Sequence, residues 1–168
     1  MEKLELANWL CRFKLSKYHQ DIEPYRGREG KFHQLFTPYE VIEGEGNLLL
    51  NEGIDEMWDL ITGAGGTAYN NSNARIGVGN GTAAAVVTQT GLQGTSTAFK
   101  GMETAYPTSI AQKATFKSSF GDTEGNFAWE EWTVDNGATA NKNLNRKVES
   151  LGTKSGGTWT LEVSITLS

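Results

Sequence analysis

Carboxylate side chains are the groups in this sequence that could most readily perform chemistry. Glu124, Glu130 and Glu131 could supply the pair of acids that a glycosidase places on either side of a glycosidic bond. Glu130 and Glu131, however, are neighbours in a predicted strand, so their side chains must point to opposite faces of the sheet. Because two carboxylates on opposite faces cannot act on one bond, glycoside hydrolysis is disfavoured. A carbohydrate-active enzyme or lectin stays a minor alternative.

The turn that begins at Asp122 carries oxygen ligands in an order that could bind calcium. Asp122, Thr123, Glu124 and Asn126 surround Gly125. The ordered ligand series and the closing bidentate glutamate of an EF-hand are missing, so the pattern favours a hairpin turn. We expect no cofactor, and a calcium ion near Asp122 is the one alternative kept open.

The cysteine and the two histidines are confined to the N-terminal part of the chain. Cys11, His19 and His33 have neither metal-ligand spacing nor a Ser-His-Asp or Cys-His arrangement. The lone cysteine is expected to be a small buried apolar residue. The glycine-rich run 76–81 lacks the third glycine of a dinucleotide loop and the Gly-Lys-Ser/Thr of a P-loop, and it predicts a strand that runs into a turn. We therefore expect a protein that is not an enzyme.

An aromatic cluster over residues 127–132 is a candidate for recognition. Aromatic rings on a strand can stack on sugars, but more often they fill a core or a subunit interface. Trp129 and Trp132 are separated by an odd number of positions, which places them on opposite faces of a regular strand. We expect one of them to lie outside the domain's own core and to bind a partner.

Charge and hydropathy limit the partners. The 168-residue chain has 15 basic and 20 acidic residues and a formal net charge of −5, which disfavours phosphate backbones, and hence nucleic acid, as the main partner. No apolar run approaches the roughly 20 residues needed to cross a bilayer, and residues 1–5 lack the pattern of a Sec signal. We expect no membrane association.

The elements that must position these residues are mostly strands. Many glycines between short alternating segments are typical of an all-β protein. Apolar and polar side chains alternate in residues 8–18 and again in 158–167, so each segment turns one face toward a core. Further strands are predicted at 38–42, 74–79, 97–102, 113–120, 127–134 and 144–151. The predicted fold is mainly β, a two-sheet, jelly-roll-like β-sandwich.

One helix and one polar arm complete the prediction. Residues 48–62 follow an asparagine that can cap a first turn, carry apolar residues at helical spacing and end at a glycine, so we expect a helix whose apolar face lies on a sheet. Residues 21–34 are polar and without periodicity, and they predict an extended, mobile arm that becomes ordered against a partner. The strand and arm occupy residues 1–46, and the helix and sandwich core occupy 47–168.

Five stretches resemble a group of small tailed-bacteriophage virion proteins. They are residues 46–54 (GNLLLNEGI), 73–84 (NARIGVGNGTAA), 88–92 (TQTGL), 126–132 (NFAWEEW) and 144–154 (LNRKVESLGTK). The resemblance extends from Gly46 to the C-terminus and brings no catalytic residues with it. It implies a structural component of the virion, assembled in the host cytoplasm.

Within that group the leading expectation is a capsid decoration, or cement, protein that binds the major capsid protein on the outer head lattice. We expect a homo-oligomer, with a trimer at threefold sites as the first arrangement to consider. The alternative is a tail, neck or fibre component with a receptor- or carbohydrate-binding surface. Residues before Gly46 match less clearly, which makes the arm a candidate attachment segment. The candidate partner-binding residues are the basic and aromatic side chains of the arm and the two strand tryptophans: Tyr25, Arg26, Arg28, Lys31, Phe32, Trp129 and Trp132.

Overall fold

Strands dominate the computed structural model, which describes residues 7–168. In chain order the elements are β1 (Trp9–Tyr18), the 3-10 helix η1 (Glu23–Tyr25), α1 (Glu29–Leu35), β2 (Glu40–Glu45), β3 (Leu48–Leu49), α2 (Asn51–Thr62), β4 (Arg75–Gly79), β5 (Thr97–Gly101), β6 (Thr108–Ile110), β7 (Lys113–Phe120), β8 (Ala128–Asp135), β9 (Asn145–Thr153) and β10 (Thr158–Leu167).

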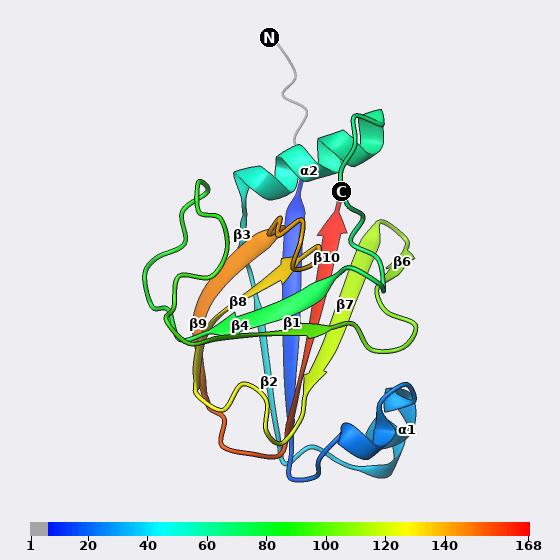
Figure 1. The fold of residues 1–168 in the computed structure, drawn as a ribbon, viewed down its shortest axis with the longest axis vertical. Coiled ribbons are helices and arrows are strands. Elements are labelled where there is room, and N and C mark those ends of the chain that lie inside the picture. The colour runs from blue at the N-terminus through cyan, green and yellow to red at the C-terminus, as the bar shows by residue number, and fades with distance from the viewer. Residues whose placement is uncertain (1–6) are drawn as a thin grey trace.

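Two antiparallel five-stranded sheets pack face to face. One has the order β2-β1-β10-β7-β6 and the other β3-β9-β8-β4-β5. Helix α2 lies across one end of the sandwich, beside the C-terminus, and α1 lies at the opposite end (Figure 1). The predicted two-sheet β-sandwich is confirmed.

The core forms because β1 and β10, at the centre of the first sheet, alternate in the same register. Phe13 lies opposite Val163, and Leu15 lies opposite Leu161; all four side chains are buried. Cys11 belongs to the same buried layer. Desolvation raises the pKa of its thiol to about 12, so it packs as the small apolar residue that was predicted.

The start of α2 differs from the prediction. Leu48 and Leu49 form a short strand against β9, and the helix begins only at Asn51. The expected cap, Asn47, instead accepts a hydrogen bond from Trp9 Nε1 at 2.8 Å. Two of the strands, β3 and β6, are too short to show a period-two pattern in the sequence.

Both candidate tryptophans lie inside the core, which corrects the expectation that one is exposed. Trp129 and Trp132 are fully buried because the β8–β9 register shifts between Trp129 and Glu131. A bulge of this kind adds one residue to a strand and resets which side chains face inward. Trp129 packs edge-to-face on Phe120, and Trp132 contacts Phe13 of the opposite sheet.

The same bulge turns Glu131 to the outer face of the second sheet, where a long loop covers it. Its carboxylate accepts hydrogen bonds from the Gly81 and Gly94 amides and forms a fully buried ion pair with Arg146. A Cβ on Gly79 would lie 2.6 Å from Glu131 Oε1. The glycine-rich run therefore surrounds a carboxylate of the protein itself, in agreement with a strand that runs into a turn.

Candidate interaction surface

The predicted arm is not extended; it folds into a small lobe, residues 22–36, which contains η1 and α1. Ile22 and Phe32 are fully buried. Phe32 makes edge contacts with Tyr18 of β1 and with Tyr25. The prediction of an unanchored segment is wrong because it overlooked these widely spaced apolar residues, which form a second, smaller core with Tyr18.

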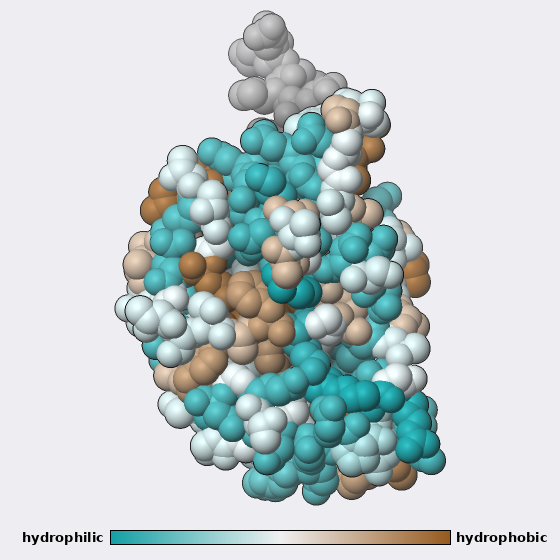
Figure 2. Space-filling model, in the orientation of Figure 1, coloured by the Kyte–Doolittle hydropathy of each residue, from teal (hydrophilic) through white to brown (hydrophobic). Residues whose placement is uncertain are grey.

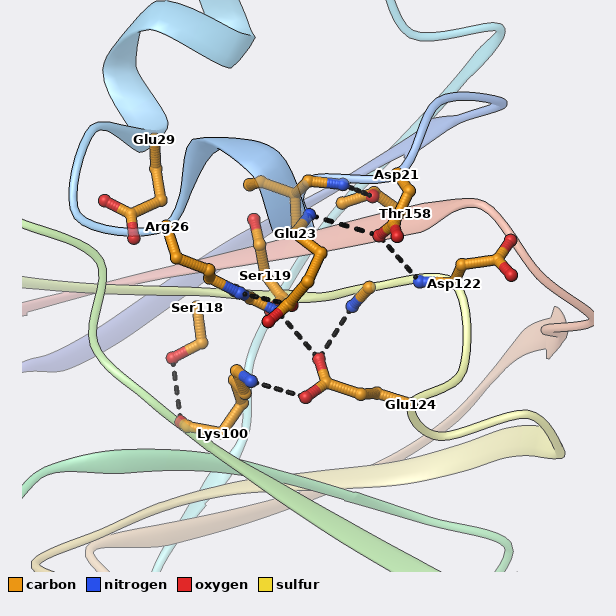
Figure 3. A network of polar contacts seen from close by, with 12 residues as sticks. Asp21, Glu23, Arg26, Glu29, Lys100, Ser118, Ser119, Asp122, Glu124 and Thr158 are labelled. Atoms are coloured by element: carbon orange, nitrogen blue, oxygen red, sulfur yellow. Dashed lines mark hydrogen bonds and ion pairs between the residues drawn. The ribbon is translucent and has the colours of Figure 1, made fainter.

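Charged contacts fasten the lobe to β5 and β7 (Figure 3). Arg26 donates one hydrogen bond to the Ser119 carbonyl oxygen at 2.8 Å and another to Glu124 Oε2 at 2.8 Å. Glu124 also pairs with Lys100 of β5. Arg26 is therefore paired within the chain, and its role in partner binding stays a prediction.

Two carboxylates in this attachment are held in the ionised form. Burial opposes ionisation of Glu124, but hydrogen bonds and attraction from Lys100, the Gly121 amide and Arg26 outweigh it and keep its pKa below the ordinary value. Glu29 is also buried, yet hydrogen bonds from backbone amides and from Thr104 lower its pKa. Both carboxylates therefore stabilise the folded lobe as anions.

A histidine, a carboxylate and a hydroxyl also meet beside the lobe. His33 Nε2 lies 2.9 Å from Glu103 Oε1, and Ser119 donates a hydrogen bond to the same oxygen at 2.5 Å. The His33 Nδ1 atom lies 3.2 Å from the Tyr18 hydroxyl. The carboxylate is in the middle, whereas a Ser-His-Asp triad has the histidine in the middle. The arrangement ties α1 to the sheet, and the histidine contacts the carboxylate rather than the serine.

The polar atoms of the turn at Asp122 are bound by groups of the chain itself. The buried Lys154 ammonium donates to the Gly121 carbonyl at 2.7 Å and to Asn126 Oδ1 at 2.9 Å. Asp122 Oδ1 accepts from the Gly157 amide at 2.8 Å. Among residues 7–168, no group of three or more His, Cys, Asp or Glu side chains is placed to hold a metal ion.

Of the seven predicted partner-binding residues, two are exposed at the surface, although the Arg28 guanidinium also donates a hydrogen bond to the Pro24 carbonyl oxygen. Arg28 and Lys31 are exposed on the lobe, and Tyr25 is half-buried. Arg26, Phe32 and the two tryptophans are used within the fold. The structure therefore does not bring the predicted residues together into one surface.

Helix α2 supplies the exposed apolar surface that the sequence reasoning missed. It contacts the sandwich through Gly53 and Glu56, both buried, and through Met57, which packs against the main core. A Cβ on Gly53 would lie 2.6 Å from the Leu144 carbonyl oxygen, so only glycine allows this approach. Glu56 accepts hydrogen bonds from the Thr67 amide at 2.5 Å and from Asn136 Nδ2 at 2.8 Å.

This contact turns much of the apolar stripe away from the body. Ile54, Trp58 and Ile61 are spaced i, i+4 and i+7 and share one face of the helix. Trp58 is 59% exposed and Ile61 is 72% exposed. The expectation that the apolar face lies on a sheet is therefore wrong for this half of the stripe. In Figure 2 hydrophilic atoms cover the viewer's side of α2, and apolar atoms emerge at its right-hand end.

A groove of about 600 Å³ runs beside the stripe, between α2 and the ends of β7 and β10. Met57 and Leu60 form its helix side, and Leu167 lies at its β10 side. Leu60 and Leu167 are both exposed, as is Ile110 at the tip of β6. We refer to Trp58, Leu60 and Ile61 together with this groove as the α2 surface. An apolar groove joined to exposed apolar side chains is typical of a protein-binding site.

One signal for the α2 surface was present in the sequence. A glycine at position 53, inside an otherwise strong helix, is unfavourable unless another backbone approaches it closely. Counting only the apolar spacing selected the wrong side of the helix as the inner one. No helix among residues 7–168 has the length and apolar character to span a bilayer.

Comparison with known proteins identifies no relative of this chain. No protein-family model, curated protein or solved structure matches the chain.

Proposed function

We propose that this chain is a non-enzymatic structural protein of a tailed-bacteriophage virion, and specifically a decoration protein that binds the major capsid protein on the outer head lattice. The resemblance over residues 46–168 supports a virion role. The α2 surface supports binding to another protein, because it places apolar groups in a position to be covered.

The orientation of α2 is the observation that carries the proposal. Burial of a large apolar side chain contributes about 1.5–3 kcal/mol, yet the fold leaves Trp58 and Ile61 in water and buries the carboxylate Glu56. The isolated chain forgoes most of this contribution at Trp58 and Ile61. Binding to a partner recovers it.

The arrangement of the two ends suits attachment to a lattice. The α2 surface and the lobe lie at opposite ends of a continuous sandwich (Figure 1). Docked through α2, the protein stands on the head with its lobe outward. Val86 and Val87, exposed in the loop that follows β4, offer an apolar contact for the trimer expected at threefold sites.

Imaging of purified virions, combined with quantitation of the chain per particle, tests the proposal. A decoration protein gives regularly repeated density over the head and high copy number, and removal of its gene removes that density. Density confined to the tail, neck or fibres, with few copies, contradicts the decoration role and supports the alternative.

A further inference from the structure

Helix α2 belongs to a segment of the chain that carries acidic but no basic side chains. Residues 32–74, which include β2 and α2, contain no lysine or arginine. The acidic side chains of this stretch are Glu40, Glu43, Glu45, Glu52, Asp55, Glu56 and Asp59. A partner that binds this surface must therefore match both its apolar shape and its negative charge.

Two of these acids border the apolar stripe directly. Asp55 and Asp59, one turn apart on α2, flank the side of Trp58 that points away from the groove. Both are exposed, and neither forms an ion pair within residues 7–168. Lys113 is the charged side chain that lines the groove itself. The outward rim along α2 therefore carries negative charge that the fold leaves unbalanced.

We propose that the α2 surface docks onto a different protein whose contact site is an apolar pocket bordered by lysine or arginine side chains. This inference rests on the proposed function and specifies the partner's chemistry. A second copy of the chain is a poor occupant, since a two-fold contact places the same surface on both sides. Two α2 helices in contact would set the aspartates of one against those of the other, and like charges at an interface oppose association.

The roles of the two kinds of side chain differ accordingly. Trp58 and Ile61 fill the partner's pocket and govern how long the complex lasts. Asp55 and Asp59 lie at the rim, where charges act mainly on the association rate and on its salt dependence. Association should therefore slow as salt is added, because exposed charges are screened over a distance of about 8–10 Å at physiological ionic strength.

Charge reversal at the rim tests this inference. The probe is phage heads purified from particles that lack this protein, and the variant is Asp55→Lys/Asp59→Lys. Its control is Glu43→Lys/Glu130→Lys, which changes the net charge equally at solvent-accessible positions away from α2. We expect the α2 variant to associate about tenfold more slowly at low salt, with its salt dependence lost. The control should stay close to the wild-type rate.

The outcomes separate the inference from the proposed function. If the wild-type protein does not bind heads at all, both are overturned. If it binds and the α2 charge reversal has no larger effect than the control, the inference alone is overturned. Sedimentation of the isolated chain is a second test. If the wild-type chain forms an oligomer and Trp58→Glu dissociates it, the α2 surface binds a second copy, and the inference is overturned.

Discussion

The lobe and α2 lie at opposite ends of the same sandwich. In each, the burial of the side chains is the reverse of what the sequence pattern predicts. The lobe is polar and aperiodic in sequence, yet Ile22 and Phe32 are fully buried in it. Helix α2 has a strong apolar stripe, yet Trp58 and Ile61 point to water. Local composition did not decide which segment was anchored. In both cases a few specific contacts did.

Those contacts differ in kind. In the lobe, Phe32 provides apolar burial while Arg26 and Glu124 provide charged hydrogen bonds across to the sheets. In α2, the approach of Gly53 to a backbone carbonyl and the two hydrogen bonds to Glu56 fix the rotation of the helix. The lobe is therefore an internal structure, whereas α2 leaves Trp58 and Ile61 exposed, where we propose that a partner binds.

The largest expected effect is a difference in the free energy of unfolding between two variants, each with one aromatic residue replaced at one end of the sandwich. Phe32→Ala should lower the free energy of unfolding by about 3–5 kcal/mol, because it empties the small core of the lobe. Trp58→Ala should change it by no more than about 0.5 kcal/mol, since the ring is mostly in water. Urea unfolding of both variants measures the difference. A Trp58→Ala variant as unstable as Phe32→Ala would show that α2 is anchored through its apolar stripe.

A smaller effect tests the rotation of α2. Glu56→Ala leaves the Thr67 amide without its acceptor and removes one of the two acceptors of Asn136 Nδ2, so we expect a loss of about 1–3 kcal/mol. Asp55→Ala, one residue earlier on the exposed face, should be neutral within about 0.5 kcal/mol. Thermal unfolding of the two variants provides the comparison. If both variants lose the same amount of stability, the hydrogen bonds of Glu56 do not fix the orientation of the helix.

Acid should loosen the lobe. The folded-state pKa values of Glu29 and Glu124 lie below the ordinary value of 4.5, so their stabilising contribution is present above that pH and is lost as the pH falls through the folded values. Hydrogen exchange, corrected for intrinsic rates, should show amides of residues 22–36 losing protection below about pH 4 while β10 stays protected. Unchanged protection of the lobe at pH 3 would contradict this.

The sequence predicted most of the fold because most strands have a regular alternation of apolar and polar residues. The segments 113–120 and 158–167 coincide with β7 and β10. The bulge in β8 was not predictable, since it depends on pairing with β9 and has no local signature. Without it Trp129 and Trp132 could not both face inward.

The candidate surface was harder to predict for the same physical reason. Ile22 and Phe32 are buried together with Tyr18 of β1, and the lobe is held in place by the hydrogen bond from Arg26 to Ser119 of β7, which is distant in sequence. The rotation of α2 depends on Leu144, in the segment before β9. Sequence patterns show which residues can be buried, but partners remote in the chain decide which of them are. Among the predicted arm residues, Phe32 is buried and Arg26 is paired within the chain, whereas Arg28 and Lys31 are exposed.

The most direct test of the account is head binding by one matched pair of variants. Trp58→Glu and Leu35→Glu each place a charge at an exposed apolar position, the first on the α2 surface and the second on the lobe, where Leu35 is 56% exposed. Binding to heads that lack this protein should be lost in Trp58→Glu and retained in Leu35→Glu, with both variants folded by circular dichroism. Binding retained in Trp58→Glu and lost in Leu35→Glu would contradict the account and move the attachment site to the lobe.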